Sequence, residues 1–333
     1  MKKIISILLI VILLTGCNNK KYENGELNVL NWSSYIPNEI IDDFINEYDI
    51  KVNYGTYSSN EELLAKISSS KKGTYDLIFP SDYMVELMRK KDMLQKIDKT
   101  KLKNLNNINP IFLNQKYDPN NEYSLPFLGA TAVIAVNRDN IKDEIKSYND
   151  LLNKKYENDI VLIDDQRIII GIGLLANGYD MNSTNLNELN KSKDWLIKLK
   201  KNVKAFDSDS PKNFLITGET NLGIIWNAEA TLAKEDNQNI ELIYPIEGHA
   251  ISIDNYVITK GAKNIENAYL FIDYLLRYEI GEQITKSYPY ISTLNKNLSY
   301  SQFELNQIIT TGSYVKNIGE YISFYDRIWA EIK

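Results

Sequence analysis

The chain has 333 residues, with 38 basic and 44 acidic side chains, a single histidine and a single cysteine. His249 and Cys17 alone cannot supply a Cys/His zinc site, a Cys–His nucleophile pair or an iron–sulfur cluster, so we expect no such metal centre. A net charge of −6 argues against a nucleic-acid partner and fits a cationic ligand better. The length suggests about two domains.

The N-terminus carries the pattern of a targeting segment. Two lysines precede an apolar run over residues 4–14, which is too short for a bilayer-spanning helix of about 20 residues. The ending L-T-G-C at Cys17 resembles the bacterial lipobox, in which the cysteine becomes the lipidated first residue. We expect a signal peptide over residues 1–16, lipidation of Cys17 and a lipidated tether over residues 17–25. The lipid would anchor the protein to the outer face of the bacterial cell membrane, or the protein would be periplasmic if an outer membrane is present.

The next segments alternate between strand and helix patterns. Runs rich in β-branched and apolar residues over 27–30, 51–57 and 76–80 indicate strands, and an amphipathic stretch follows each of them. Ser59 begins a capping box before the second of these helices, and Ser81 is placed to cap the third.

The alternation continues through the second half of the chain. The strand over 131–137 is interpreted as the crossing into a second α/β unit. Other strands are predicted over 159–163, 222–225, 240–244 and 251–259, and helices over 189–200, 265–278 and 320–332. The pattern predicts an α/β fold with a mostly parallel sheet, and such sheets bind ligands beyond the carboxyl ends of their strands.

The motifs of common enzyme classes are missing from the sequence. His249 has no G-x-S-x-G elbow to partner it, there is no G-x-x-x-x-G-K-[ST] phosphate loop, and Gly171-Ile172-Gly173 lacks the third glycine of a dinucleotide fingerprint. Paired carboxylates could catalyse glycoside hydrolysis, but 44 acids make any pair easy to nominate. We expect no enzymatic activity and no cofactor.

The predicted strand ends share one composition, an aromatic ring, a carboxylate or both. These clusters are 32–35, 81–83, 164–165, Trp226 with Glu229, and 254–256. Such a lining suits an elongated cation whose ammonium ends bind carboxylates while its methylenes lie on aromatic faces. Rim packing and helix capping are the alternative for any one cluster. Five clusters together favour a shared cleft.

Several segments in order resemble the spermidine/putrescine-binding proteins of bacterial ABC importers. They cover residues 31–37, 75–84, 114–126, 221–227 and 261–276. The resemblance implies a two-domain periplasmic-binding-protein fold, each domain a mostly parallel sheet flanked by helices, with the ligand cleft at the hinge. It also implies a monomer without enzymatic activity.

We assign the two α/β domains from this resemblance. The first would comprise residues 26–132 plus 253–298, and the second residues 133–252 plus 299–333. Crossings between them are expected near 131–137 and 249–254, where a hinge would let the domains close.

The resemblance also implies which residues bind the ligand. The aromatic box would consist of Trp32, Tyr35, Tyr83, Trp226 and Tyr288, the hydroxyl positions are Ser33 and Ser81, and the carboxylates are Asp165 and Asp254, with Glu229 as a further acid. This sequence departs from the family at Ile168, where a second acid is missing, at Ser252, where many members have tryptophan, and near Val315, where a member has glutamine.

These residues predict a membrane-tethered receptor that delivers spermidine or putrescine to the subunits of an ABC permease. The alternatives are a receptor for another small solute, such as a sugar or oligopeptide, and an extracellular glycosidase lipoprotein. Ligand length stays open at this point. Glu229 could replace the missing acid and favour spermidine, or hold the end of a shorter diamine and favour putrescine.

Overall fold

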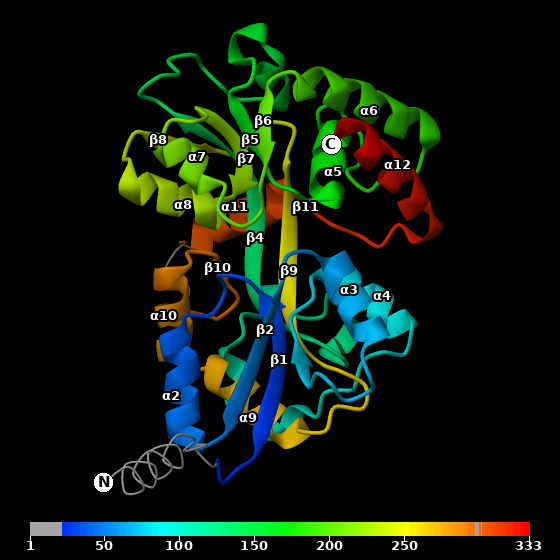
Figure 1. The fold of residues 1–333 in the computed structure, drawn as a ribbon, viewed down its shortest axis with the longest axis vertical. Helices are drawn as coiled ribbons and strands as arrows, with labels where there is room; N and C mark the ends of the chain where they lie inside the picture. The colour runs from blue at the N-terminus through cyan, green and yellow to red at the C-terminus, as the bar shows by residue number, and fades with distance from the viewer. Residues whose placement is uncertain (1–21, 297–299, 301) are drawn as a thin grey trace, which may run out of the picture.

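The computed structural model describes residues 22–296, 300 and 302–333 (Figure 1). The predicted signal peptide, Cys17 and most of the predicted tether lie outside these residues. Within the described part of the chain, no helix is long and apolar enough to cross a membrane.

The strands of the described residues form one eleven-stranded sheet. The main path runs β2 (Lys51–Tyr57), β1 (Glu26–Trp32), β3 (Leu77–Ile78), β9 (His249–Ile258), β4 (Leu125–Asn137), β7 (Leu222–Trp226), β5 (Ile160–Leu162) and β6 (Val203–Phe206). Off this path, β8 (Ile240–Ile243) and β10 (Ile291–Ser292) pair with β4, and β11 (Gly312–Tyr314) pairs with β9.

The two ends of the sheet are parallel, and its middle is mixed. β1 is parallel to β2 and β3, and β5 is parallel to β6 and β7. β4 is antiparallel to β7, β8, β9 and β10, and β9 is antiparallel to β3 as well. The predicted α/β fold is confirmed, but the sheet is less parallel than expected because β4 and β9 carry the chain between the halves of the molecule instead of forming β–α–β units.

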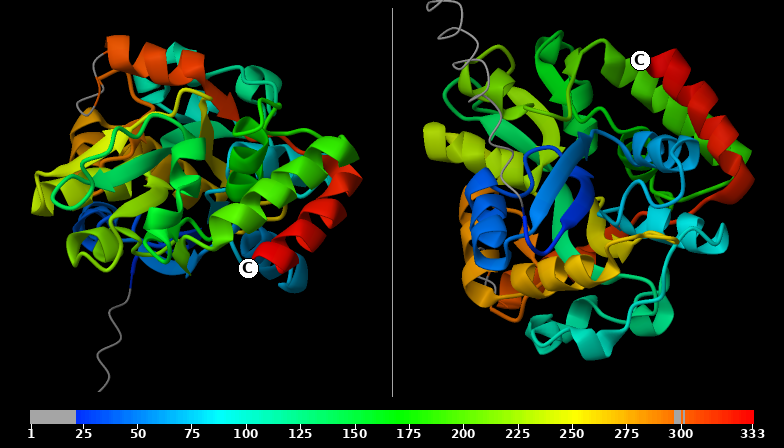
Figure 2. Two further views of the ribbon diagram at one scale, coloured as in Figure 1. Left: turned by 90° about the horizontal axis from the view of Figure 1, so that it is seen from above. Right: turned by 60° about the horizontal axis from the view of Figure 1, so that its bottom comes forward.

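The helices gather in two groups (Figures 1 and 2). We call the lower group in Figure 1 the first lobe; it surrounds β1–β3 with α2 (Asn38–Tyr48), α3 (Asn60–Ser69), α4 (Asp82–Lys90), α9 (Ile265–Leu275) and α10 (Tyr278–Ser287). The second lobe surrounds β5–β8 with α5 (Gln166–Leu175), α6 (Leu186–Lys200), α7 (Lys212–Ile216), α8 (Asn227–Asp236) and α12 (Ile322–Ile332). α12, red in Figure 2, lies along α5 and α6 and so completes the second lobe at the end of the chain.

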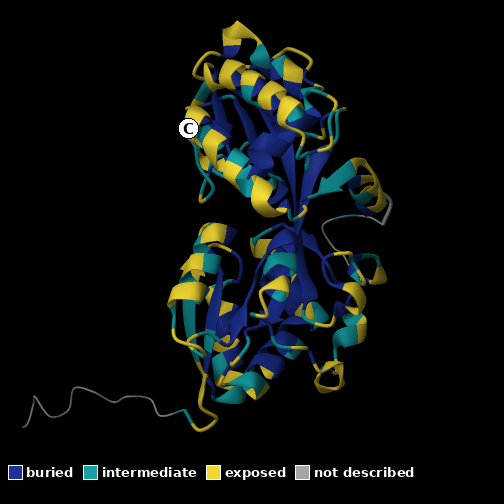
Figure 3. Ribbon diagram, turned by 90° about the vertical axis from the view of Figure 1, so that its right-hand side faces the viewer, coloured by how far each residue is buried: buried dark blue, intermediate teal, exposed yellow. Residues whose placement is uncertain are grey.

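Two long strands, β4 and β9, run through the waist between the lobes. Every residue of β4 and β9 is buried, and Figure 3 shows these strands passing through the waist. His249 is fully buried there, with its ring nitrogens against the hydroxyls of Thr131 on β4 and Thr311 at the end of α11 (Gln302–Thr311). Burial lowers the pKa of His249 to about 4, so it is neutral at physiological pH. The lone histidine thus packs three chain segments together, and the predicted domain boundaries near these crossings stay predictions.

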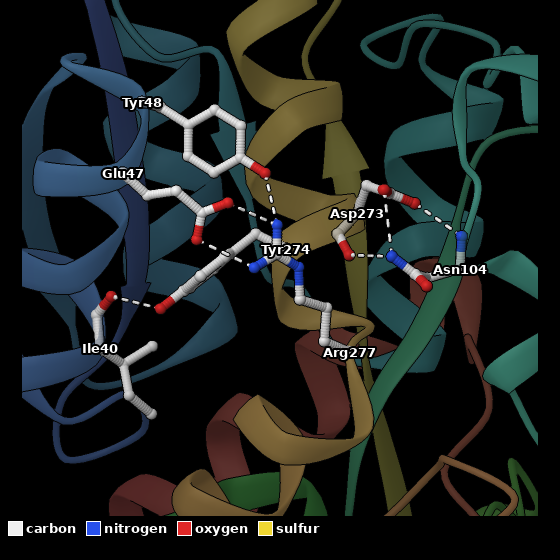
Figure 4. Close-up of polar contacts among 7 residues, drawn as sticks. All are labelled: Ile40, Glu47, Tyr48, Asn104, Asp273, Tyr274 and Arg277. Atoms are coloured by element: carbon white, nitrogen blue, oxygen red, sulfur yellow. Dashed lines mark hydrogen bonds and ion pairs between the residues drawn. The ribbon is translucent and has the colours of Figure 1, made fainter.

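The helix predicted over residues 265–278 ends at Leu275, and a second helix, α10, begins at Tyr278. Arg277 takes an extended backbone conformation (φ −67°, ψ 139°) and separates α9 from α10. Its guanidinium donates to both carboxylate oxygens of Glu47 on α2, at 2.9 and 2.6 Å, and to the Tyr48 hydroxyl at 2.7 Å (Figure 4). One turn earlier, on α9, the Tyr274 hydroxyl donates to the Ile40 carbonyl of α2. Contacts at and just before the break therefore hold α9 against α2.

The two predicted serine caps behave differently. The Ser59 hydroxyl accepts the Glu62 amide as expected, although the Glu62 carboxylate accepts from Ser58 instead of completing a capping box. Ser81 occupies the N-cap position of α4, but its hydroxyl makes no capping bond. That prediction is wrong because the hydroxyl donates to Asp254, a residue 173 positions away.

Candidate functional site

One cavity lies between the lobes, at the carboxyl ends of the parallel strands. It encloses about 700 Å³, part of it open to solvent. Eight of the ten predicted ligand-binding residues line it: Trp32, Ser33, Tyr35, Ser81, Tyr83, Asp165, Trp226 and Asp254. The structure therefore brings together side chains from β1, α4, α5, β7 and β9, as expected for an α/β sheet.

Asp254 is the most enclosed acid of the cavity wall. Its carboxylate accepts the Ser81 hydroxyl at 2.6 Å and the Tyr35 hydroxyl, and it is 4% exposed. No described lysine or arginine forms an ion pair with it. Burial raises the pKa of Asp254 to about 6, although the Ser81 and Tyr35 hydroxyls favour the ionised form. Asp254 is thus a buried carboxylate that is hydrogen-bonded but has no opposite charge.

Asp165 faces the same cavity from the second lobe. It is the N-cap of α5, and its carboxylate accepts the Ile168 amide at 3.0 Å. Burial and the charge of Glu61 raise the pKa of Asp165 to about 6, against the Ile168 amide and the Arg167 charge. Each lobe therefore contributes one carboxylate that an ammonium group would stabilise.

Aromatic rings line the cavity from both lobes. In the first lobe, the Trp32 ring lies 4.6 Å from Tyr57, and the Tyr35 ring lies 4.6 Å from Tyr290, measured between centroids. Trp226, at the end of β7, contributes the second lobe's ring. These faces suit methylene groups and cations.

The cavity is lined by Tyr290 and not by Tyr288, the tyrosine that was predicted to bind the ligand. Tyr290 lines the cavity, whereas Tyr288, the C-cap of α10, borders a neighbouring hollow that also includes Trp32, Ser33 and Tyr35. The sequence Tyr288-Pro289-Tyr290 offers two tyrosines at one strand entry, and pattern alone could not choose between them. Ligand contact by Tyr288 stays a prediction.

Glu229 is buried on α8 but is not among the lining residues. Both of its carboxylate oxygens lie 3.4 Å from the Lys212 ammonium of α7. Burial raises the pKa of Glu229, and Lys212 opposes this rise. Its carboxylate already has a cationic partner, so the structure gives no support to either predicted role, and contact with a ligand stays a prediction.

The sequence analysis missed two charged residues of the wall. Asp209 lies in the loop after β6, and its carboxylate accepts the Ser33 hydroxyl of the other lobe at 3.3 Å. Arg167, next to Asp165, is 2% exposed and also lines the cavity. Asp209 follows the end of a strand, which is the signal that identified the other site residues. The sequence did not predict that strand, β6, so Asp209 was not identified.

The ionisable groups of the cavity wall carry a formal excess of two negative charges. The wall has three carboxylates, those of Asp165, Asp209 and Asp254, against the single guanidinium of Arg167. Among the residues that the structure describes, no group of three or more His, Cys, Asp or Glu is placed to hold a metal ion. The charge and the aromatic faces of the wall suit an organic cation, which could form charge-assisted hydrogen bonds and aromatic contacts there.

A two-lobed α/β fold with an interlobe cavity defines the class of solute-binding proteins. The family model for bacterial extracellular solute-binding proteins matches residues 39–303, and the chain belongs to this family. This membership confirms the prediction of a binding protein instead of an enzyme.

Individual relatives share most of the chain. The spermidine/putrescine-binding periplasmic protein of Salmonella typhimurium is 36% identical over 321 residues, covering 93% of this chain and 92% of that protein. The putrescine-binding periplasmic protein PotF of Escherichia coli is 30% identical over 283 residues, covering 79% of this chain and 76% of that protein. A solved protein from Listeria monocytogenes, described as a spermidine/putrescine ABC transporter, superposes with a TM-score of 0.86 at 29% identity, covering 92% and 98% of the two chains. The predicted resemblance and the periplasmic-binding-protein fold are confirmed.

The N-terminal segment matches a second family model. The model for the prokaryotic membrane lipoprotein lipid attachment site matches residues 1–18. The predicted lipoprotein and its lipid-anchored, extracytoplasmic location are confirmed by this match.

The raised pKa values predict how the stability of the ligand-free protein depends on pH. An Asp whose folded pKa lies above its unfolded value of about 4 stabilises the folded state below that value. The contribution is lost as pH rises through the folded pKa, which is about 6 for both Asp165 and Asp254. Asp254→Asn should therefore raise the free energy of unfolding at pH 8 by about 1 to 3 kcal/mol, with little gain at pH 4.

Denaturant unfolding at the two pH values measures this effect. Asp164→Asn is the control. Asp164 precedes Asp165 in the sequence, but its carboxylate is paired with Lys333 at the surface. An Asp254→Asn protein that is no more stable than the wild type at pH 8 would show that ionised Asp254 does not destabilise the folded protein, and it would contradict the raised pKa of this carboxylate.

Proposed function

We propose that this protein is the polyamine receptor of an ABC importer and that its preferred ligand is a diamine such as putrescine. The observation that carries the proposal is the pair of carboxylates, Asp165 and Asp254, that face one aromatic-lined cavity from opposite lobes without a bound opposite charge. The printed names of the relatives, which include spermidine/putrescine-binding and putrescine-binding proteins, support the ligand class.

The chemistry of the wall suggests how the ligand lies. One ammonium would bind Asp254, which the Ser81 and Tyr35 hydroxyls hold in place, and the other would bind Asp165. The methylenes would lie against Trp32 and Trp226. An ammonium that binds a desolvated carboxylate supplies the charge that burial otherwise leaves without a partner, so the interaction is stronger than at a surface.

The preference for a diamine rests on the lack of a further acceptor at several positions of the wall. A secondary ammonium, as in spermidine, needs a third acceptor, and a buried charge without one is costly. Ile168 and Val315 offer only hydrocarbon, and Arg167 adds a like charge. Asp209, which accepts from Ser33, is the remaining acid. The formal excess of two negative charges matches a dication.

A neutral solute and a glycosidase are weaker candidates. A sugar can lie on the tryptophan faces, but it gives the carboxylates of Asp165 and Asp254 no opposite charge. A glycosidase finds no support, because the family is one of solute-binding proteins. We further propose that the receptor acts as a monomer, that its predicted domains close around the ligand, and that it delivers the ligand to the permease subunits.

Calorimetric titration with putrescine, spermidine and a neutral sugar tests the function. We expect putrescine to bind at least as tightly as spermidine, and the sugar not to bind. Asp254→Asn and Asp165→Asn should each weaken putrescine binding by about 2 to 5 kcal/mol through loss of a desolvated charge pair. Trp226→Ala should weaken it by about 1 to 2 kcal/mol. Asp164→Asn again serves as the control and should bind like the wild type.

Two results would count against this proposal. Wild-type protein that binds neither amine, or sugar alone, would refute polyamine reception. Spermidine binding tenfold or more tightly than putrescine would refute the diamine preference and leave the ligand class intact.

The identity of residue 168 tests the origin of the preference. Ile168→Glu restores an acid at the missing position and should shift the ratio of affinities towards spermidine, because its secondary ammonium gains a partner. Ile168→Gln, of equal size and without charge, controls for the disturbance of a buried apolar side chain. The same ratio in the Glu and Gln variants would mean that charge at this position does not select the ligand.

A further inference from the structure

Arg167 spans the boundary between the lobes. It belongs to α5 of the second lobe, yet its guanidinium lies 5.4 Å from the ring centroid of Tyr83, on α4 of the first lobe. On its other side, Tyr325 of α12 lies 5.0 Å away. One buried cation is thus held between a ring from each lobe.

Its polar contacts leave part of the guanidinium without a partner. One terminal nitrogen donates to the Lys316 carbonyl at 2.8 Å and to the Asn182 side chain at 3.3 Å. Both acceptors belong to the second lobe or to the segment that enters it after β11. The Nε–H is buried and makes no hydrogen bond, so a donor is left unsatisfied in the interlobe region.

Asp82 is the corresponding acid on the first lobe. It is 1% exposed at the start of α4, and one carboxylate oxygen accepts the Tyr83 amide at 2.8 Å. The other oxygen is buried and makes no hydrogen bond of good geometry, although the Ile253 amide lies close enough to favour the ionised carboxylate. Burial, together with the Asp254 charge, raises the pKa of Asp82, while the Tyr83 and Ile253 amides and the Arg167 charge lower it. Buried polar atoms without partners are rare in folded proteins, and two of opposite sign near one boundary call for a common explanation.

We propose that Asp82 and Arg167 form an interlobe latch, in which the free carboxylate oxygen of Asp82 accepts from the guanidinium of Arg167 when the lobes close fully on a ligand. The inference rests on the proposed function, since closure requires a ligand. Closure satisfies both unpartnered atoms at once, so the pair stabilises the closed state and not the open one.

Ligand binding at Asp254 and ionisation of Asp82 are coupled through the charges of these two carboxylates. An ammonium on Asp254 neutralises the carboxylate whose charge acts on Asp82. Ionised Asp82 then becomes less unfavourable, and the guanidinium supplies its partner. Asp82 does not line the cavity, so it serves as a positioning residue that affects affinity only through closure.

The test combines affinity with the size of the protein in solution. Asp82→Asn should weaken putrescine binding roughly tenfold or more, because a smaller fraction of the protein reaches the closed state. Arg167→Gln removes the same latch together with a like charge of the cavity wall, so it serves as the second arm of the double-variant comparison. Small-angle scattering should show a smaller contraction of the radius of gyration at saturating putrescine than in the wild type. The double variant should bind no more weakly than Arg167→Gln alone, since each change removes the same interaction.

Arg89→Gln is the matched control. Arg89 lies on the same helix as Asp82 and also has a buried Nε–H without a partner, but it does not line the cavity. It should bind and contract like the wild type. If Arg167→Gln does not fold, Asp82→Asn still decides the question.

Each other outcome refutes a distinct claim. Wild-type affinity and full contraction in Asp82→Asn would refute the latch, as would additive losses in the double variant. A wild-type protein that binds no polyamine would instead refute the proposed function.

Discussion

The arrangement of this protein depends on the burial of Asp254 at the waist between its lobes. An ionised carboxylate in such a position is costly unless it has hydrogen bonds and an opposite charge. The protein supplies the hydrogen bonds, from Ser81 and Tyr35, but not the charge. In the proposed function this carboxylate favours a cationic ligand, because such a ligand supplies the opposite charge that the protein lacks.

The fold explains why several side chains reach one point from distant parts of the sequence. Parallel strands of each lobe end at the cavity, and the crossing strand β9 passes between them with Asp254 in its middle. β4 and β9 are buried along their whole length, so the strands that connect the lobes are part of the core. Arg167 and Asp209 are where the lobes already touch, through Tyr83 and Ser33.

Much of this could be predicted from local pattern. Strand ends that carry Trp32, Asp165 and Trp226 follow from hydrophobic runs and from the rule that α/β sheets bind ligands at their carboxyl edge. The two long antiparallel strands could not be predicted this way, because direction in a sheet depends on distant pairing. The break at Arg277 likewise depends on its ion pair with Glu47 on another helix.

The partners of several site side chains could not be predicted from the sequence for the same reason. Ser81 has the sequence signature of a helix cap, but its hydroxyl donates to the buried carboxylate of Asp254 on β9. Glu229 follows Trp226 as a ligand-binding acid would, yet Lys212 from the preceding helix is its partner. Asp82 belongs to one of the strand-end clusters, but its unpartnered oxygen and the buried Nε–H of Arg167 are visible only once both lobes are in place.

Proton release on binding tests the central claim most directly. Putrescine should lower the pKa of Asp165 and Asp254 from about 6, because an ammonium stabilises the ionised carboxylates. Calorimetric titrations at pH 6, in buffers that differ in ionisation enthalpy, should therefore show net proton release that diminishes towards pH 8. A binding enthalpy at pH 6 that is independent of the buffer would mean that the carboxylates are already ionised without a ligand, and it would contradict the account.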